Sequence, residues 1–271
     1  MGSLSIAVHQ PGYHRHLYYF YKMAVSDAFV SLDNVQYVAR EWQNRQEFFY
    51  QGRRRWLSVP VSRGRELIRD KRITDQEAVR SHWSVIRTAY RSAPHFATYA
   101  PLLEEVYTTD WEHLRDLCDA LTRIVREALG ITTPYLRASD LVHRPSLTRG
   151  ALLADLVRKA VPHVHGSAGP RPPEITYLAC AAPMRADHYL LQPSVTEPGM
   201  TESQVMEEQG IRVGCFTYRH PVYRQPQLPA AHPFQAELSA FDLLFNHGPR
   251  ARDILLGAGE AARRDGIGAS I

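Results

Sequence analysis

The chain has 271 residues, of which 44% are hydrophobic, so it can bury a substantial core, and we expect residues 1–271 to form a single domain. The formal net charge is only +4 and no run of like charge exceeds the three arginines at 53–55, which argues against a dedicated DNA-binding face. No segment is apolar over the length of a membrane span, and the N-terminus lacks a secretory pattern, so the sequence predicts a cytoplasmic protein.

The first part of the chain predicts a strand, a helix and a second strand. Apolar runs at 4–8 and 28–32 are typical of short buried strands. Between them, Leu17, Phe20 and Ala24 recur at helical spacing. A strand–helix–strand unit of this length requires the two strands to be parallel.

The next part predicts a β-hairpin followed by helices. We expect the hairpin near 46–61, on either side of a Gly-containing turn. A helical subregion should then cover about 74–130. Its helices are expected to begin at Thr74 as the N-cap, near His95, and at Asp110.

The second half of the chain is less regular, and residues 174–200 are its least readable part. We expect strands at 133–136, 161–165 and 211–218, helices at 151–160, 204–209 and 238–247, and a frayed tail from about 257. In the last helix Ser239 should be the N-cap and Asp242 its reciprocal partner. The order of elements predicts an α/β fold: an open, mostly parallel sheet flanked by helices in three Rossmann-like layers, with the hairpin and a helical insertion added.

Polar side chains follow both early strands at the point where each strand ends. His9 and Gln10 follow the first strand, and Asp33 and Asn34 follow the second, with Gln36 two residues further on. In open α/β sheets ligands bind at the carboxyl ends of the strands, so these groups would meet at one edge. The alternative is that His9 and Asp33 cap strand ends and only hydrogen-bond turns.

The three cysteines, at 118, 180 and 215, are far apart and lack metal-ligand spacing, so we expect free thiols. His163 and His165 would alternate on the predicted strand at 161–165 and face the same side. With His9 or His220 they could hold zinc, but no ligand spacing recurs, and no metal or other cofactor is predicted.

Six blocks of this sequence, in the same order along the chain, resemble the WbqC-like family. They are 9–11 (His-Gln-Pro), 32–37 (Leu-Asp-Asn-Val-Gln-Tyr), 42–45 (Trp-Gln-Asn-Arg), 56–61 (Trp-Leu-Ser-Val-Pro-Val), 220–225 (His-Pro-Val-Tyr-Arg-Gln) and 238–248 (Leu-Ser-Ala-Phe-Asp-Leu-Leu-Phe-Asn-His-Gly). Two regions depart from the family pattern. The usual opening continues Asn-Tyr-Leu-Pro-Trp, whereas residues 12–16 here are Gly-Tyr-His-Arg-His, and the segment 163–200 is longer and more divergent.

The resemblance implies an accessory enzyme of surface-polysaccharide or natural-product biosynthesis, of a kind proposed to transfer an acyl or aminoacyl group to an amine. The implied partners are a small-molecule amine and an acyl carrier protein or other thioester donor. Amide formation needs a base and oxyanion donors, and His9 is the best base because imidazole titrates near neutrality. Asp33 could fix the tautomer of His9, as the carboxylate of a hydrolase triad does.

The groups expected to bind the substrates are polar or aromatic side chains of the same blocks, namely Gln10, Tyr13, Asn34, Gln36, Asn44, Arg45, His220, Tyr223 and Gln225. Ser31 and Ser167 are available as nucleophiles, but neither lies in a Gly-x-Ser-x-Gly context. A direct transfer without a covalent intermediate is therefore the preferred mechanism.

Two other functions remain open at this point. One is a nucleotide-dependent transferase or ligase of the HxxH type, in which His9 and either His14 or His16 would contact phosphates. The other is a non-catalytic, partner-binding protein that uses an exposed aromatic surface, to which Tyr13, Tyr18, Tyr19 and Tyr21 would contribute. An edge strand and a Tyr-rich face would also suit a homodimer.

Overall fold

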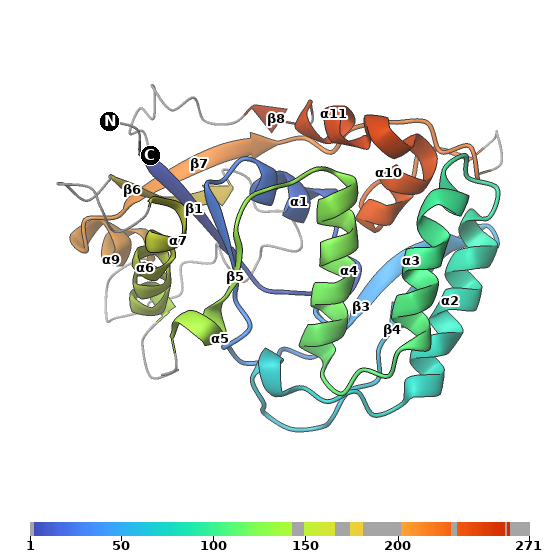
Figure 1. Ribbon diagram of the computed structural model, residues 1–271, viewed down its shortest axis with the longest axis horizontal. Helices are drawn as coiled ribbons and strands as arrows, with labels where there is room; N and C mark the ends of the chain where they lie inside the picture. The colour runs from blue at the N-terminus through green and yellow to red at the C-terminus, as the bar shows by residue number, and fades with distance from the viewer. Residues whose placement is uncertain are drawn as a thin grey trace.

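The computed structural model describes residues 3–142, 149–165, 174–180, 202–228, 232–257 and 259–260. A six-stranded sheet lies at its centre and consists of β1 (Leu4–His9), β2 (Ala28–Ser31), β5 (Tyr135–Arg137), β6 (Ile175–Cys180), β7 (Arg212–Tyr218) and β8 (Gly259–Glu260). The strand order is β5-β2-β1-β6-β7-β8 (Figure 1). The first five strands pair in parallel and β8 pairs antiparallel with β7. The predicted open, parallel α/β sheet is confirmed.

The strand order reverses at β1. After β1 the chain adds β2 and β5 on one side, and it then returns to add β6 and β7 on the other side. β1 is buried on both faces, because Ile6 and Val8 contribute to one hydrophobic core while Ala7 contributes to the other. A strand covered on both faces is apolar over most of its length, which explains why Ser5 is the one polar residue of the run at 4–8. The carboxyl end of β1 is therefore the switch point, the position at which such sheets usually bind ligands.

Helices cover both faces of the sheet. One face is covered by α5 (Ala138–Leu141), α6 (Arg149–Ala160), α7 (Pro162–His165) and α9 (Glu202–Glu208). The other face is covered by α1 (Leu17–Ala24), α4 (Leu114–Ala128), α10 (Ala240–His247) and α11 (Ala251–Leu256), as Figure 1 shows. Short 3-10 helices occur at η1 (Ile68–Asp70) and η3 (Gly248–Arg250). The three expected layers are thus present.

A hairpin and two helices extend the layer on the α1 side. The hairpin strands are β3 (Arg45–Tyr50) and β4 (Arg53–Ser58), and the helices are α2 (Gln76–Tyr90) and α3 (Phe96–Thr108). They lie together at one end of the molecule, beyond α4 (Figure 1). Gln51 and Gly52 form the turn with φ values of 51° and 76°, and positive φ at both positions is the requirement of a two-residue hairpin turn that follows the strand twist.

Two predicted helix starts are wrong. The N-cap of α2 is Asp75, whose carboxylate accepts a hydrogen bond from the Ala78 N–H at 2.9 Å, rather than Thr74. α4 begins at Leu114 rather than at Asp110, because the Asp110 carboxylate instead pairs with Arg80. In both cases the sequence offers a residue type that suits an N-cap, but a neighbouring side chain or a tertiary contact decides where the helix begins.

Two predicted strands also need correction. Residues 161–165 form a helical turn, in which the Val164 N–H donates to the Val161 carbonyl at 3.0 Å, so the expected strand at this position is wrong. β4 ends at Ser58, before Pro60, so the hairpin is shorter than 46–61. β6 lies in the segment at 174–200, for which the sequence predicted no element. Ser167, named above as a possible nucleophile, and residues 181–200 fall outside the described residues.

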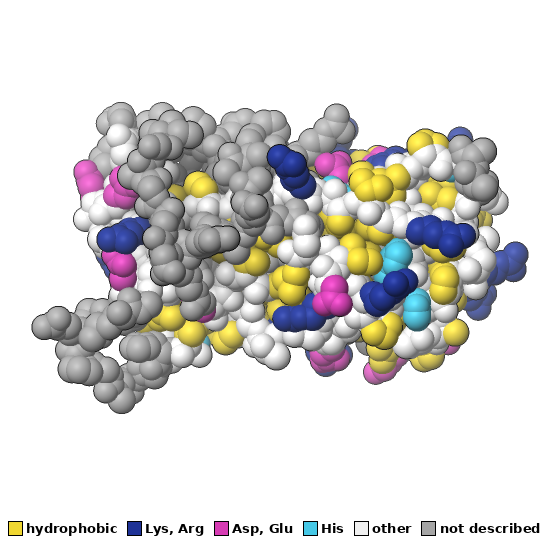
Figure 2. All heavy atoms as spheres, turned by 90° about the horizontal axis from the view of Figure 1, so that it is seen from above, with side chains coloured by type: hydrophobic (Ala, Val, Ile, Leu, Met, Phe, Trp, Pro, Cys, Tyr) yellow, Lys and Arg dark blue, Asp and Glu magenta, His cyan; other side chains and the backbone are white. Residues whose placement is uncertain are grey.

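Within the described part of the chain, none of the helices has the length and apolar character needed to cross a bilayer. Figure 2 shows the face that carries α10 and α11, where basic, acidic and hydrophobic side chains are interspersed. The described residues of this face therefore do not form one continuous basic patch.

Gly12 lies in the loop after β1, where it packs closely against Trp42 and Arg15. A methyl group at this position would lie 2.6 Å from Arg15 Nε and closer still to the Trp42 carbonyl oxygen. We expect Gly12→Ala to destabilise the protein by about 1–3 kcal/mol through overpacking, measured by urea unfolding. As the control, Gly257→Ala should change stability by less than about 0.5 kcal/mol, because its nearest neighbour is 3.4 Å away and its φ of −73° suits alanine. Equal effects of the two substitutions would contradict this account.

Candidate functional site

His9 is the last residue of β1 and lies at the switch point of the sheet. Only 2% of the residue is exposed, and its ring packs edge-on against Tyr19, with the ring centroids 5.3 Å apart. In the strand register His9 lies opposite Ser31, the last residue of β2. The structure therefore puts His9 where the sequence predicted it, at a strand end that faces α1.

Burial lowers the pKa of His9 well below its usual value, and the positive charges of Arg15 and Lys22 lower it further. Arg15 Nη2 donates to the carbonyl oxygens of Gln10 at 2.6 Å and Pro11 at 3.1 Å. Lys22 Nζ donates to the Val8 carbonyl at 3.0 Å. The imidazole is thus neutral at physiological pH and has two buried cations near it.

Asp33 follows β2 but does not take the position expected for a partner of His9. Its Oδ1 accepts from the Ser139 N–H at 2.8 Å, and its Oδ2 accepts from the Ser139 hydroxyl at 2.7 Å and from Arg115 Nη1 at 3.3 Å. The carboxylate is fully buried and joins the end of β2 to the start of α5 and to α4. These contacts support an anchoring role rather than orientation of an imidazole.

The other residues predicted near these strand ends have separate surroundings. Asn34 is buried, and its Nδ2 lies 3.4 Å and 3.3 Å from the carbonyl oxygens of Ala138 and Val142, whereas Gln36 is exposed. Gln10 is half-buried, and its Oε1 accepts from Gln43 Nε2 at 2.9 Å. Gln10 and His9 are therefore neighbours at the switch point, while Asn34 holds the chain around α5.

Asn44 and Arg45 belong to the base of the hairpin. Asn44 Nδ2 donates to the Val59 carbonyl at 2.8 Å and so holds the chain after β4. The Arg45 guanidinium lies 4.2 Å from the centre of the Trp56 ring, a cation–π contact at a side chain that is 41% exposed. Both residues were predicted to bind substrate, and these contacts hold their side chains against β4 and the chain that follows it.

Tyr13 belongs to a buried polar cluster rather than to a surface. Its hydroxyl is hydrogen bonded to His82 Nδ1 at 2.8 Å and to the Tyr107 hydroxyl at 2.6 Å. His14 Nε2 and the Tyr107 hydroxyl are also hydrogen bonded, 2.6 Å apart, and His14 Nδ1 lies 3.2 Å from Ser239 Oγ. Because these groups bond one another, the expectation that His14 contacts a phosphate is not supported by this geometry.

His16 is likewise buried, and burial lowers its pKa to about 3. Gln46 Nε2 lies 3.1 Å from His16 Nδ1 and also donates to the His14 carbonyl at 2.7 Å. The ring packs against Trp42, with the centroids 4.4 Å apart. His16 therefore connects the loop after β1 to the hairpin.

Three predicted binding residues from the C-terminal part of the chain lie around α10 instead of the switch point. They are His220, Tyr223 and Gln225. Tyr223 Oη and Gln225 Nε2 each donate to Asp242 Oδ2 at 2.8 Å. His220 Nε2 accepts from the Glu237 N–H at 3.2 Å. Asp242 was expected to cap α10, and that prediction is wrong, because its buried carboxylate instead holds the segment at 218–228.

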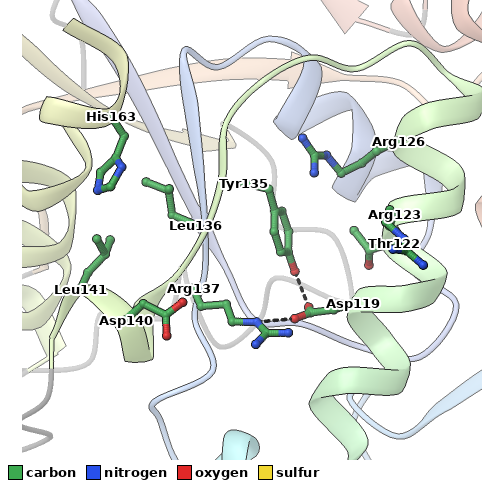
Figure 3. Close-up of a pocket in the computed structure, with 10 residues that line it drawn as sticks. All are labelled: Asp119, Thr122, Arg123, Arg126, Tyr135, Leu136, Arg137, Asp140, Leu141 and His163. Carbon is green, nitrogen blue, oxygen red and sulfur yellow. Dashed lines mark hydrogen bonds and ion pairs between the residues drawn. The ribbon is translucent and has the colours of Figure 1, made fainter. Parts of the chain in front are cut away.

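A cavity that the sequence did not reveal lies on the outer side of β5, between α4 and the α5–α7 segment (Figure 3). Its volume is about 460 Å³. Asp119 accepts from Tyr135 Oη at 2.7 Å and from Arg137 Nε at 2.7 Å, and burial raises the pKa of this carboxyl. The sequence does contain charged residues at helical spacing along the polar face of α4. Solvent-exposed helix faces have the same spacing of charges, so this pattern alone does not indicate a cavity.

The zinc site that the histidines suggested as an alternative is not supported among the described residues. Among the described residues, no group of three His, Cys, Asp or Glu side chains is arranged to hold a metal. His163 is exposed on α7 rather than on a strand, and the side chain of His165 lies outside what the structure describes. Cys118 is buried, as expected, and burial raises the pKa of its thiol, whereas Cys215 is exposed.

The comparisons with known proteins agree with the resemblance. The profile of the WbqC-like protein family matches residues 10–254. A protein of Mycobacterium tuberculosis, named as uncharacterized protein Rv1507c, is 29% identical over 255 residues, which cover 92% of this chain and 96% of that protein. No solved structure matches the chain.

The buried histidines should make the fold sensitive to acid. Burial lowers the pKa of His82 to about 4 and of His16 to about 3, and it also lowers the pKa values of His9 and His14. Between those values and about 6.5 the unfolded chain binds protons that the folded state does not bind, so the free energy of unfolding should fall as the pH falls below about 6.5. Urea unfolding between pH 4.5 and 8 measures this dependence.

The variant His82→Gln should reduce the slope of stability against pH by up to one proton between about pH 4 and 6.5. His232→Gln, at an exposed position, should leave the slope unchanged. An unaltered slope in His82→Gln would show that this ring is protonated in the folded state.

Asp33 should contribute more to stability than an exposed aspartate. Asp33→Ala leaves the Ser139 N–H and the buried end of Arg115 without an acceptor, so we expect a loss of about 3–5 kcal/mol in urea unfolding at pH 7. Asp253→Ala, at an exposed position on α11, should cost less than about 1 kcal/mol. A loss below about 1 kcal/mol in Asp33→Ala would contradict the anchoring role.

Proposed function

Because the chain belongs to the WbqC-like protein family and has His9 at the reversal of its strand order, we propose that it is an acyl or aminoacyl transferase that forms an amide on an amine acceptor. The observation that carries the proposal is the state of His9. The side chain is buried at the carboxyl end of the central strand, and burial together with Arg15 keeps its pKa low. A neutral imidazole at a ligand-binding edge can accept a proton during a reaction.

The proposed reaction joins an acyl thioester to a primary amine. The amine nitrogen attacks the carbonyl carbon, the C–N bond forms, and the carbonyl oxygen becomes an oxyanion. His9 removes a proton from the attacking nitrogen, which becomes acidic as the bond forms, so a weak base is sufficient. The C–S bond then breaks, and His9 returns the proton to the leaving thiolate, giving an amide and a free thiol.

Arg15 and Lys22 support this chemistry electrostatically. Their charges destabilise a protonated His9 and so preserve the base before reaction. The same charges would stabilise an oxyanion or a carboxylate bound beside His9, and in a water-poor site this effect is larger than in solvent. Both cations are fixed by backbone carbonyl groups, so little reorganisation is needed when charge develops.

A direct transfer is favoured over a thiol intermediate, because the buried Cys118 has a raised pKa. Ser31 is the nearest candidate for a covalent route, since it lies opposite His9 in the strand register and its residue is fully buried. In the proposed direct mechanism Ser31→Ala retains transfer, whereas a covalent acyl–serine route would lose it.

The setting of this proposal is biosynthetic. The donor would be an acyl carrier protein or another thioester, and the acceptor a small amine of a polysaccharide or natural-product pathway in the cytoplasm. Homodimer formation through an edge of the fold is compatible with this role.

We expect pantetheine thioesters to raise the melting temperature of the wild-type protein and to release thiol in the presence of an accepted amine. The screen uses a panel of acyl and aminoacyl pantetheine thioesters with a panel of primary amines, and it follows thiol release by absorbance. His9→Gln should lower kcat/KM by about 10²–10⁴, the usual contribution of a general base. The acid limb of the wild-type rate profile should lie below pH 6.5, because the pKa of His9 is lowered.

His232→Gln serves as the control, since this histidine is exposed and far from β1 in the chain. Unchanged turnover in His9→Gln would remove the central residue of the mechanism. Stabilisation by ATP or a nucleotide sugar, with no response to any thioester, would favour the nucleotide-dependent alternative.

A further inference from the structure

The cavity on the outer side of β5 has features of a binding site, and His9 is not among the residues that line it. It holds about 460 Å³, which is within the range of small-molecule pockets. Figure 3 shows Arg123 and Arg126 on the α4 wall, with Asp140 and His163 across the cavity and Leu136 between them. β5 is the edge strand of the sheet, so no further strand fills this space in the described structure.

The carboxylate on the α4 wall is already neutralised within the protein. Asp119 accepts hydrogen bonds from Tyr135 and Arg137, and Arg137 Nη2 also lies 3.2 Å from Asp116 Oδ1. Asp116 Oδ1 also accepts from Arg115 Nε at 3.1 Å, so both carboxylates are paired with arginines of the protein. They shape the floor of the cavity without leaving a strong negative charge for a cationic ligand.

Arg123 and Arg126 differ from that set, because neither makes an ion pair with a carboxylate of the described residues. They are three residues apart on α4, and like charges at this spacing repel. Arg126 is held in place by a 2.6 Å hydrogen bond from Nη2 to the Thr133 carbonyl and by the Tyr135 ring, whose centre is 5.2 Å from the guanidinium. Its Nε is buried and makes no hydrogen bond to the described residues.

We propose that this cavity binds a small molecule that carries an oxyanion, a carboxylate or a phosphate, which is gripped by Arg123 and Arg126. A planar guanidinium donates two parallel hydrogen bonds to either group, and an anion also relieves the repulsion between the two arginines. Leu136 and Leu141 line the cavity and give it an apolar side. The ligand therefore has a short apolar body beside its charged end.

One residue that lines the cavity, Arg137, ends its strand on the same side of the sheet as the proposed catalytic His9. His9 lies opposite Ser31, and Ser31 lies opposite Arg137, so the three residues end neighbouring strands and face the same side. Two strand spacings separate His9 from Arg137, or roughly 10 Å between backbones. Binding in the cavity does not require the transfer chemistry, so the two proposals fail or succeed separately.

The test measures the melting temperature of the full chain against butyrate, butyl phosphate and inorganic phosphate, with ionic strength held constant by chloride. A ligand that binds only the folded state raises the melting temperature in a saturable way. Butanol, which lacks the charge, reports binding by the apolar body alone. Saturation by butyrate identifies a carboxylate site, and saturation by the two phosphates identifies a phosphate site.

The variants are Arg123→Gln/Arg126→Gln and, as the matched control, Arg87→Gln/Arg91→Gln. The control removes the same charge from two exposed arginines of the α2 region, away from the cavity. We expect the cavity variant to weaken the apparent Kd at least about tenfold and the control to leave it unchanged. Arg123→Gln alone, at an exposed position, repeats the test without disturbing the contact of Arg126 with Thr133.

Three results would overturn the proposal. One is the absence of saturable stabilisation by any of the anions. Another is an equal loss of affinity in the cavity and control variants, which would indicate only the general charge of the protein. The third is equal stabilisation by butanol and butyrate, which would show that the arginines do not select a charged ligand.

Discussion

The loop between β1 and α1 is held by buried polar contacts on which the rest of the structure depends. Tyr13 and His14 bond Tyr107 of α3, and His14 reaches the N-cap of α10 at Ser239. Gln46 of the hairpin bonds the same loop. Buried polar groups are costly unless their partners are all in place, so the sheet, the hairpin and the outer helices must assemble around this loop together. His14 accordingly keeps a φ of 50°, a conformation that a non-glycine residue adopts only when its surroundings require it.

The polar residues in the sequence blocks that resemble the family have different structural roles. Asp33 and Asp242 are fully buried carboxylates whose oxygens accept from several donors, and each fixes one segment of irregular chain against a helix. Asn44 does the same for the chain after β4. His9 differs from them, because it ends the central strand at the point where the strand order diverges and has buried cations near it. Position and charge together favour His9 over the anchoring residues as the reacting group.

The sequence predicted those features of the fold that depend on local pattern. Mostly apolar runs identified β1 and β2, and their polar ends correctly indicated the edge of the sheet at which His9 lies. Tertiary contacts decided the rest. Asp110 was a good N-cap by pattern, but Arg80 engages it, and the helical turn at 161–165 contradicts the strand expected from alternating residues. The pairing of Asp33 with Ser139 joins positions 106 residues apart, and no spacing within one sequence reveals such a contact.

The edge of the sheet also explains why a reaction site and a separate anion site could occur in one small protein. Parallel strands place their carboxyl ends side by side, so His9, Ser31 and Arg137 form a row although they come from distant parts of the chain. The two ends of this row differ in their electrostatics. At His9 the cations lie in the core and keep an imidazole neutral, whereas at β5 the arginines border a cavity and remain available to a ligand. The proposed transferase would use both conditions, since its base must be uncharged while a charged part of a substrate is held. In the order β1–β2–β5, one strand lies between His9 and the cavity, so the two positions are close but distinct within a single sheet.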